Sequence, residues 1–299
     1  PEHPRPQLTR AGWRSLNGEW DFAFDMSVSK RAREFWKNGA YTHKITVPFC
    51  PESSLSGIGF TDFIPAVWYR RSFSLSAEEC AGRVLLHFGA VDYRCEVWVN
   101  ETPAGFHKGG YSSFTFDITG AVQPGENTVV LYAVDDVRSP LQPTGKQCPQ
   151  YASQGCHYTR TTGIWQSVWL EFVPKTYISA LKMETDPDNG LPTFEAKLNE
   201  AAEGTLTVTA SFEGAPAGET SLKVRGASVR GQLSVADVKV WDIGAPNLYD
   251  LSFTLETEGG RDTVQSYIGF RSIEWKDKKF YLNGRSVFQR LVLDQGFYP

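Results

Sequence analysis

The chain has 299 residues, of which 41% are hydrophobic and 21% charged, and its formal net charge is -4 at pH 7. This near balance of charge excludes a dominant electrostatic attraction to nucleic acid or to an anionic membrane, and the apolar content is too high for a disordered chain. No stretch approaches the roughly 20 apolar residues of a membrane span, and residues 1–10 have no apolar signal-peptide core, so the sequence predicts a soluble globular protein of about two domains.

Strand patterns dominate the first 174 residues. The best helix candidate is short, over residues 29–37, and stops at Asn38-Gly39. Alternating or continuous apolar runs predict strands at residues 67–75, 83–88, 96–100, 113–118, 127–134 and 162–173. Short strands punctuated by Gly and Pro are typical of an antiparallel β-sandwich.

Residues 135–163 form a long segment with little periodicity. Loops of this length tend to be functional or disordered. Its polar and aromatic side chains, which include Tyr151, His157, Tyr158 and Arg160, favour a loop that faces a ligand. We do not expect a metal at His157, because no second ligand is suitably spaced.

The five cysteines are scattered at irregular spacing and include no CxxC pair, so a structural zinc site is not expected. A chain of this length does not need disulfides for stability. We expect free, buried thiols in a reducing compartment, and a Cys148–Cys156 disulfide is the alternative. The thiols and the missing signal peptide together favour a cytoplasmic location, and a periplasmic or secreted location is the alternative if a signal peptide has been removed.

From residue 175 a second series of strand patterns begins. We place these strands at residues 177–185, 193–198, 205–212, 220–224, 229–235 and 249–257. About this many short strands in roughly 100 residues is the size of an immunoglobulin-like sandwich. Its polar faces hold no cluster that suggests chemistry, so this region is interpreted as a spacer.

The C-terminal segment changes character. Residues 280–288 predict a hairpin, because Asn283-Gly284 suits a type I′ turn. Residues 289–296 follow as an apolar strand that ends in polar residues and glycine, which is how a parallel barrel presents catalytic groups. Only 29 residues follow Phe270, against the roughly 250 of a whole barrel, so we expect that the sequence is cut there.

Nine segments carry a resemblance to a known family and occur in that family's order. They are LNGEWDF (16–22), WYRRSF (68–73), FGAVDY (88–93), VWVN (97–100), GGYSSF (109–114), GIWQSVWL (163–170), WDIGAP (241–246), GFR (269–271) and LDQGFYP (293–299). With them the chain resembles the N-terminal part of glycoside hydrolase family 2, the β-galactosidases, β-glucuronidases and β-mannosidases. One departure is Asn100-Glu101, where the family usually has Asn-Gly.

The resemblance implies an all-β fold in three parts. Residues 1–174 would form a jelly-roll β-sandwich of the kind called sugar-binding in the family, and residues 175–271 an immunoglobulin-like β-sandwich. Residues 272–299 would supply a short hairpin and strand that begin a (β/α)₈, or TIM, barrel.

The implied function is that of the N-terminal region of a retaining exo-β-glycosidase. Retaining enzymes use two carboxyl groups about 5–5.5 Å apart, and in this family both glutamates lie on later barrel strands. We therefore assign no catalytic residue here and expect the chain alone to be inactive. No organic cofactor or metal site is expected. The implied partners are a carbohydrate substrate and the chain's own barrel, with a homo-oligomer left open.

Two groups of residues are candidates for substrate binding. Asp294 and Gln295 would lie at the C-terminal end of the first barrel strand, where polar groups face the active site; a structural hydrogen bond to the next strand is the alternative for Asp294. On the 135–163 loop, Tyr158 and Arg160 would reach over the barrel mouth. His157 lies near the place where the β-galactosidase relatives carry an acidic sugar contact.

Arg160 has two interpretations. Its planar set of donors suits a substrate carboxylate or hydroxyls, and it could instead pair with Asp135 or Asp136 and hold the loop.

Two other classes of protein stay open. A freestanding carbohydrate-binding sandwich fits the 13% aromatic content, because sugar faces stack on rings, although the barrel-type strand at residues 280–299 argues against it. A protein-interaction sandwich would expose an apolar patch and leaves the long polar loop unexplained.

Overall fold

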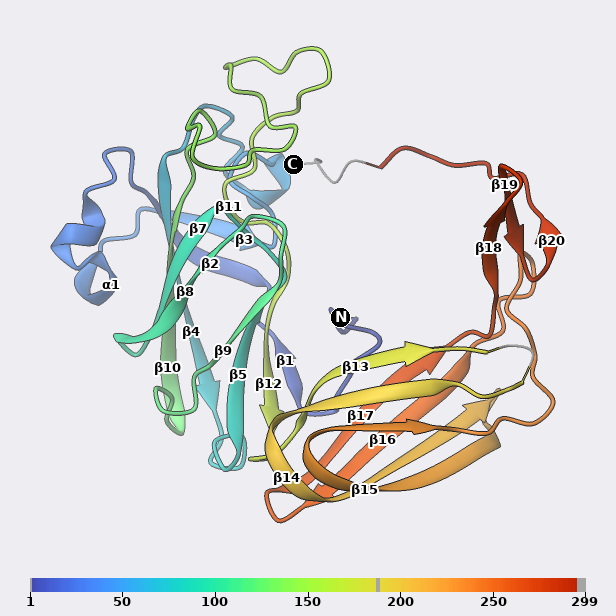
Figure 1. Cartoon of the computed structure of the whole chain (residues 1–299). Coiled ribbons are helices and arrows are strands. Elements are labelled where there is room, and N and C mark those ends of the chain that lie inside the picture. The colour runs from blue at the N-terminus through green and yellow to red at the C-terminus, as the bar shows by residue number, and fades with distance from the viewer. Residues whose placement is uncertain (1, 187–188, 295–299) are drawn as a thin grey trace. The chain divides into compact units, whose positions relative to one another are not determined.

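The computed structural model describes residues 2–186 and 189–294 (Figure 1). The chain divides into two compact units. The first unit holds Gly12–Phe172 together with Asp294, and the second unit holds residues 2–11 together with Val173–Leu293. The prediction placed residues 1–11 with the first sandwich, whereas residues 2–11 contact the second unit.

The first unit consists of two antiparallel sheets and one short pair of strands. The larger sheet has the order β3 (His43–Val47), β2 (Gly18–Phe24), β4 (Ala66–Leu75), β10 (Gly125–Val134), β7 (Arg94–Val99) and β8 (Thr102–Lys108). The smaller sheet has the order β1 (Trp13–Ser15), β12 (Val168–Val173), β5 (Arg83–Phe88) and β9 (Phe114–Asp117). The short pair is β11 (Gly163–Ile164) with β6 (Val91–Asp92).

The core of the first unit lies between its two sheets. Successive side chains of a strand point to opposite faces, so Val67 and Tyr69 of β4 enter this core while Trp68 joins a second apolar cluster. Leu86 and Leu170 enter the core from β5 and β12 of the smaller sheet. The alternation that predicted an antiparallel sandwich therefore also places its core.

The predicted helix at residues 29–37 is present but divided in two. Phe35 packs its ring 5.1 Å from that of Trp68, so the segment covers the second apolar cluster. Glu34 separates the two pieces because its φ of 51° is left-handed. The pieces are η1 (Lys30–Arg33) and α1 (Phe35–Asn38).

The predicted strand at residues 162–173 is also divided. Gly163 begins β11 with a φ of +73°, and β12 begins only at Val168. Between them the indole of Trp165 donates a hydrogen bond of 2.8 Å to the Gly110 carbonyl. The continuous apolar run hid this break, because half-buried Trp165 lies outside both ladders.

The main part of the second unit is one bent sheet around its own core. Its strands are β13 (Ile178–Glu184), β14 (Thr193–Phe212), β15 (Ala215–Gln232), β16 (Tyr249–Thr257) and β17 (Gly260–Ile268). The first part of β14 pairs with β13 and the last part with β16, and the register of its pairing with β15 shifts between Lys197 and Ala202. Bends of this kind let one strand serve both layers of a sandwich.

Two predicted pairs of strands in the second unit are single strands. The runs at 193–198 and 205–212 both belong to β14, and those at 220–224 and 229–235 fall largely on β15. The polar residues between the runs suggested loops. The chain instead keeps its ladder through a bulge there.

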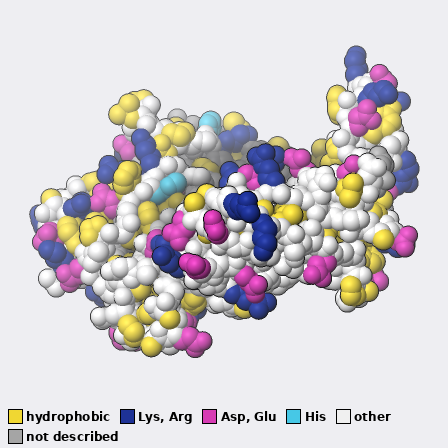
Figure 2. All heavy atoms as spheres, turned by 60° about the horizontal axis from the view of Figure 1, so that its bottom comes forward, with side chains coloured by type: hydrophobic (Ala, Val, Ile, Leu, Met, Phe, Trp, Pro, Cys, Tyr) yellow, Lys and Arg dark blue, Asp and Glu magenta, His cyan; other side chains and the backbone are white. Residues whose placement is uncertain are grey.

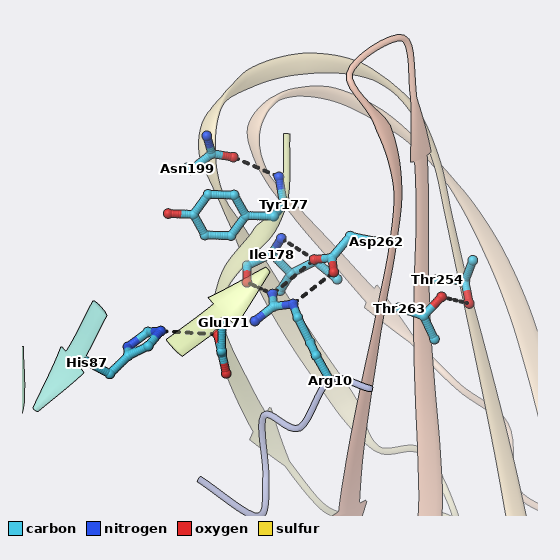
Figure 3. A network of polar contacts seen from close by, with 9 residues as sticks. All are labelled: Arg10, His87, Glu171, Tyr177, Ile178, Asn199, Thr254, Asp262 and Thr263. Atoms are coloured by element: carbon cyan, nitrogen blue, oxygen red, sulfur yellow. Dashed lines mark hydrogen bonds and ion pairs between the residues drawn. The ribbon is translucent and has the colours of Figure 1, made fainter. Parts of the chain in front are cut away.

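The N-terminal arm, residues 2–11, is tied to the second unit by a buried ion pair. The Arg10 guanidinium donates to both carboxylate oxygens of Asp262, at 2.8 and 2.9 Å, as Figure 3 shows. The Ile178 backbone N–H donates to the same carboxylate at 2.8 Å. Thr9 pairs with Gln265, and Leu8 contacts the core. These contacts explain why the arm does not belong to the first sandwich.

The predicted C-terminal hairpin is confirmed. Asn283 and Gly284, with φ of 51° and 73°, form the turn. It belongs to a small sheet of β18 (Ile273–Lys276), β19 (Lys279–Leu282) and β20 (Arg285–Ser286). The strand predicted at residues 289–296 is not formed over residues 287–294, where Val292 is 91% exposed. An unpaired strand has no ladder to hold it.

All five cysteines lie in the described ranges and are free. Cys148 is buried and Cys156 exposed, so the alternative of a disulfide between them is not realised.

On the face shown in Figure 2, acidic and basic side chains are interspersed, in agreement with the small net charge. Among residues 2–186 and 189–294, none of the helices is long and apolar enough to cross a membrane.

Candidate functional site

The 135–163 loop folds back on itself. Its two arms meet where Gln147 and Tyr158 form a bridge. The Tyr158 backbone N–H donates to the Lys146 carbonyl at 2.7 Å, and the Cys148 N–H donates to the Tyr158 carbonyl at 2.8 Å. These bonds give the loop a defined shape, so its side chains keep fixed positions relative to one another.

Arg160 is one of the largest fully buried side chains of the chain. Its guanidinium donates to the carbonyls of four residues and lies 4.5 Å from the centre of the Phe63 ring. The four carbonyls belong to Thr61, Cys148, Gln150 and Tyr151. Arg160 therefore holds the loop, as the second interpretation expected. Carbonyls take the place of Asp135 and Asp136 as its partners.

Three carboxyl groups converge at the base of the loop. Glu52 precedes η2 (Ser54–Ser56), Asp92 ends β6, and Asp135 follows β10. Their exposed fractions are 4%, 1% and 3%. Buried carboxyls are uncommon unless they are paired, so the groups that satisfy them decide what this cluster does.

Thr162 links two of these carboxyls to the end of the loop. Its backbone N–H donates to Glu52 Oε2 at 3.1 Å, and its hydroxyl donates to Asp135 Oδ2 at 3.3 Å. From the other arm, Gln142 Nε2 donates to Asp135 Oδ1 at 2.7 Å. Both arms of the loop are thus bonded to the same carboxyl.

Asp92 is bonded to the middle of the loop. Gln147 Nε2 donates to Asp92 Oδ2 at 2.8 Å, and Gln147 Oε1 accepts from the Thr161 N–H at 2.8 Å. A Cβ added at Gly110 would lie 2.3 Å from Asp92 Oδ1. Glycine is therefore required at position 110 for this carboxyl to lie where it does.

The electrostatics of the cluster favour protonated acids. Burial, assisted by the charges of Asp135 and Glu52, raises the pKa of Asp92 to about 8. Burial likewise raises the pKa of Glu52 to about 7 and that of Asp135 to about 6. The groups that oppose these shifts are amides, hydroxyls, backbone N–H groups and the Cys50 thiol.

A pocket of about 230 Å³ lies beside the loop base. Its wall includes the carboxyls of Asp135 and Asp136, and the Arg138 guanidinium lies 4.2 Å from the centre of the Phe63 ring. The lining combines these polar residues with apolar ones such as Phe63 and Ile64. A mixture of this kind suits a hydroxyl-rich ligand. Within the described ranges, no group of three or more His, Cys, Asp or Glu side chains is arranged to hold a metal ion.

The structure places three predicted site residues on one loop. His157 is exposed and its backbone N–H donates to the Gln154 carbonyl at 3.1 Å. Tyr158 is half-buried, and Arg160 of the same loop is buried. Asp294 is exposed, and Gln295 lies outside the described residues. The role of His157 and Tyr158 as ligand contacts stays a prediction, and Arg160 holds the loop that carries them.

Sequence reasoning missed the carboxyl cluster. Asp92 is the lone charged residue of the apolar run 88–93, and Asp135 directly follows the apolar run of β10. A single acidic residue within an apolar run, or directly after one, is a sequence signal of a buried acid. Glu52 stands between Pro51 and Ser53 in a polar turn and gives no such signal.

Two family profiles match the chain. The first, described as "Glycosyl hydrolases family 2, sugar binding domain", matches residues 13–174. The second, described as "Glycosyl hydrolases family 2", matches residues 176–271. Together they cover most of the chain, but not residues 2–12 or the region of β18, β19 and β20.

Curated relatives are β-glycosidases by name. A β-glucuronidase-like protein of Formosa agariphila is 33% identical over 235 residues, which are 75% of this chain and 27% of the relative. The human β-glucuronidase is 25% identical over 92% of this chain and 47% of its own length. The β-galactosidase of Priestia megaterium is 25% identical over 94% of this chain and 30% of its own length. The chain thus spans less than half the length of each of these relatives.

Solved structures agree on the fold. The Ruminococcus gnavus β-glucuronidase, in a complex with D-glucuronic acid, matches with a TM-score of 0.76 at 22% sequence identity. The match covers 94% of this chain and 50% of that chain. It confirms the predicted all-β sandwich fold, and at this identity it bears on the fold alone.

Proposed function

The chain belongs to glycosyl hydrolase family 2, and on that basis we propose that it is the non-catalytic N-terminal region of a retaining exo-β-glycosidase. The observation that carries this proposal is the match of the two family profiles to residues 13–174 and 176–271. The reaction would be hydrolysis of terminal β-linked sugars. Both catalytic glutamates would lie in the part of the relatives' length that this chain does not span, so the chain alone would be inactive.

The role of the first unit would be to present the 135–163 loop to a catalytic barrel. The bonds that shape the loop support this role, because substrate contacts act only when they are held in place. His157 and Tyr158 would then contact the substrate, and Asp294 and Gln295 would do so from the first barrel strand.

The names of the relatives include both β-glucuronidases and β-galactosidases. A glucuronide carries a carboxylate, for which Arg160 would be an obvious receptor. Because Arg160 is buried and bonded to four carbonyls, a uronate carboxylate would have to be bound by other residues. The sugar is therefore not chosen by this side chain.

The test is hydrolysis of nitrophenyl β-glycosides by the 299-residue chain. The panel holds the galactoside, glucuronide, mannoside and glucoside, with a heat-denatured sample as the background. We expect no turnover above background for any of them. Turnover that is lost in a variant of one buried carboxyl, such as Glu52→Gln, would mean that a complete active site lies within this chain, and the proposal would be wrong.

A second candidate function is sugar binding by the chain itself, which the 230 Å³ pocket favours. Tryptophan fluorescence can be titrated with galactose, glucuronate and mannose. Saturable quenching by one sugar, lost in Asp136→Ala at the pocket wall, would support a binding module. Quenching that is absent or linear for all three would leave the first proposal alone.

A further inference from the structure

We propose that Glu52, Asp92 and Asp135 form a proton-dependent latch that holds the 135–163 loop on the first unit. This inference goes beyond the proposed function and does not depend on it, because loop opening is measured on the chain itself. It concerns how the loop is held, not what the loop contacts.

The loop contacts every member of the carboxyl cluster. Each of the three carboxyls accepts a hydrogen bond from the loop: Glu52 and Asp135 from Thr162, and Asp92 from Gln147. Glu52 and Asp92 stand on the framework of the sandwich, before η2 and on β6. Asp135 is the first residue of the loop, directly after β10, and its backbone N–H is fixed to the Pro65 carbonyl at 3.0 Å. Opening of the loop would therefore bring water to all three groups at once.

Asp92 is surrounded by an amide and by acidic groups from several elements. Gln147 faces it from the loop, Glu52 from the turn before η2, and Asp135 from the end of β10. Tyr111 also lies close, since burial and the charges of Asp92 and Asp135 raise its pKa. The titratable neighbours named here are all acidic, so an ionised Asp92 would meet like charges in a buried place.

The surroundings of Glu52 and Asp135 lead to the same conclusion. Glu52 is faced by the Cys50 thiol and by the Tyr69 phenol of β4, whose pKa values are both raised by burial and by the charge of Glu52. Asp135 is faced by Asp136 of its own segment and by the amide of Gln142.

Two arginines line the 230 Å³ pocket together with Asp135. The Arg160 guanidinium is engaged by four carbonyls and lies over the Phe63 ring. The exposed Arg138 guanidinium lies over the same ring. Neither arginine is among the groups that shift the pKa of Asp135, which burial raises.

One oxygen atom of the cluster lacks a hydrogen bond. Glu52 Oε1 is buried and has no hydrogen-bond partner within residues 2–186 and 189–294. A buried carboxylate oxygen without a partner is costly, whereas a neutral acid tolerates the same place better. The geometry therefore suits the protonated form of Glu52.

The sign of the pH dependence follows. A carboxyl that titrates higher in the closed loop than in the open loop stabilises closure fully below its open-loop pKa, near 4. That stabilisation is lost as pH rises through the closed-loop pKa. The pKa values of about 6, 7 and 8 set the window, so closure weakens from about pH 4 to about pH 8 and then levels off.

The experiment is hydrogen exchange of the loop amides from pH 5 to pH 9, corrected for the intrinsic rates of an unstructured peptide. The reporting amides are those of Cys148, Thr161 and Thr162, which are hydrogen-bonded in the closed loop. We expect their protection to fall on the order of tenfold per pH unit for each carboxyl that titrates. The amides of β16 in the second unit are the internal control and should not follow this curve.

Two matched variants complete the test. Asp92→Asn keeps an acceptor for Gln147 but cannot ionise. The protection of the reporting amides in this variant should therefore level off at a lower pH than in the wild type. Glu126→Gln neutralises an exposed carboxyl at the opposite end of β10 and should follow the wild-type curve. Near-ultraviolet circular dichroism at pH 6 checks that Asp92→Asn folds; if it does not, Asp135→Asn replaces it.

Wild-type protection that stays constant from pH 5 to pH 9 would overturn the latch. A neutralised carboxyl of the cluster that leaves the wild-type curve unchanged would also overturn it.

Discussion

Each unit buries a carboxyl group almost completely in a different way, Asp262 in the second unit and Asp92 in the first. Asp262 of the second unit is 2% exposed, and it accepts two hydrogen bonds from the Arg10 guanidinium and one from the Ile178 N–H (Figure 3). Asp92 of the first unit is 1% exposed, and its partner is the neutral amide of Gln147. One acid is held by a cation, and the other lies among acids and amides.

Burial alone therefore does not decide what a buried acid does. An ion pair that keeps both partners is compatible with the interior, but removal of one partner leaves an uncompensated charge. A buried acid without a cation avoids that charge by keeping its proton. The second unit should therefore be sensitive to loss of the arginine, and the first unit to loss of the proton.

The largest effect is expected for Arg10→Ala. It leaves Asp262 buried without its guanidinium, and loss of one partner of a buried pair costs about 3–5 kcal/mol. Urea unfolding followed in the second unit measures the free energy of unfolding. The double variant Arg10→Met with Asp262→Leu should recover much of the loss, because it removes the stranded charge as well. A loss below about 1 kcal/mol in Arg10→Ala would break the comparison.

The next effect is a pH-dependent stability difference for Asp92→Asn. In the wild type the raised pKa of Asp92 stabilises the first unit at acid pH, and this contribution decreases as pH rises toward about 8. Each pH unit in that window corresponds to about 1.4 kcal/mol. The free energy of unfolding of the variant, measured relative to that of the wild type, should therefore rise by about 2–3 kcal/mol between pH 5 and pH 7. Urea unfolding at both pH values measures it. An equal difference at the two pH values would contradict the expectation.

A smaller effect is expected for Gly110→Ala. Its Cβ would lie 2.3 Å from Asp92 Oδ1, and overpacking of this kind costs about 1–3 kcal/mol. The control is Gly120→Ala, because a Cβ at Gly120 meets nothing within 4 Å. Thermal unfolding of the first unit compares the two variants. Equal melting temperatures would show that Asp92 shifts without cost.

The smallest effect is expected for Cys156→Ser. Cys156 is exposed, and exposed substitutions usually change stability by less than about 0.5 kcal/mol. A thiol reagent should label Cys156 in the folded chain and reach the buried Cys148 only after unfolding. Labelling of Cys148 in the folded chain at pH 6 would mean that the loop is open under conditions where it should be closed.

Much of the fold could be predicted because its signals are local. Alternation placed β4, a continuous apolar run placed β10, and the Asn283-Gly284 turn placed the C-terminal hairpin. The join of two predicted strands into β14 was missed, because the bulge near Lys197 keeps the ladder through a polar stretch that suggested a loop.

The candidate site was less predictable because its contacts are long-range. Glu52, Asp92 and Asp135 are separated in the sequence by about 40 residues each, and the fold alone brings them together. The loop-holding role of Arg160 was foreseen as an alternative, but its carbonyl partners were not. Carbonyl positions depend on the conformation of the loop, which residue types do not encode.

A carbon-13 NMR titration of the side-chain carboxyls measures directly whether the buried acids of the first unit hold their protons above the usual pH range of carboxyl groups. Asp92→Asn, Asp135→Asn and Glu52→Gln would assign the three signals. The account predicts that these carboxyl carbons titrate between about pH 6 and pH 8, with Asp92 last. Three carboxyls that are already ionised at pH 5 would contradict it.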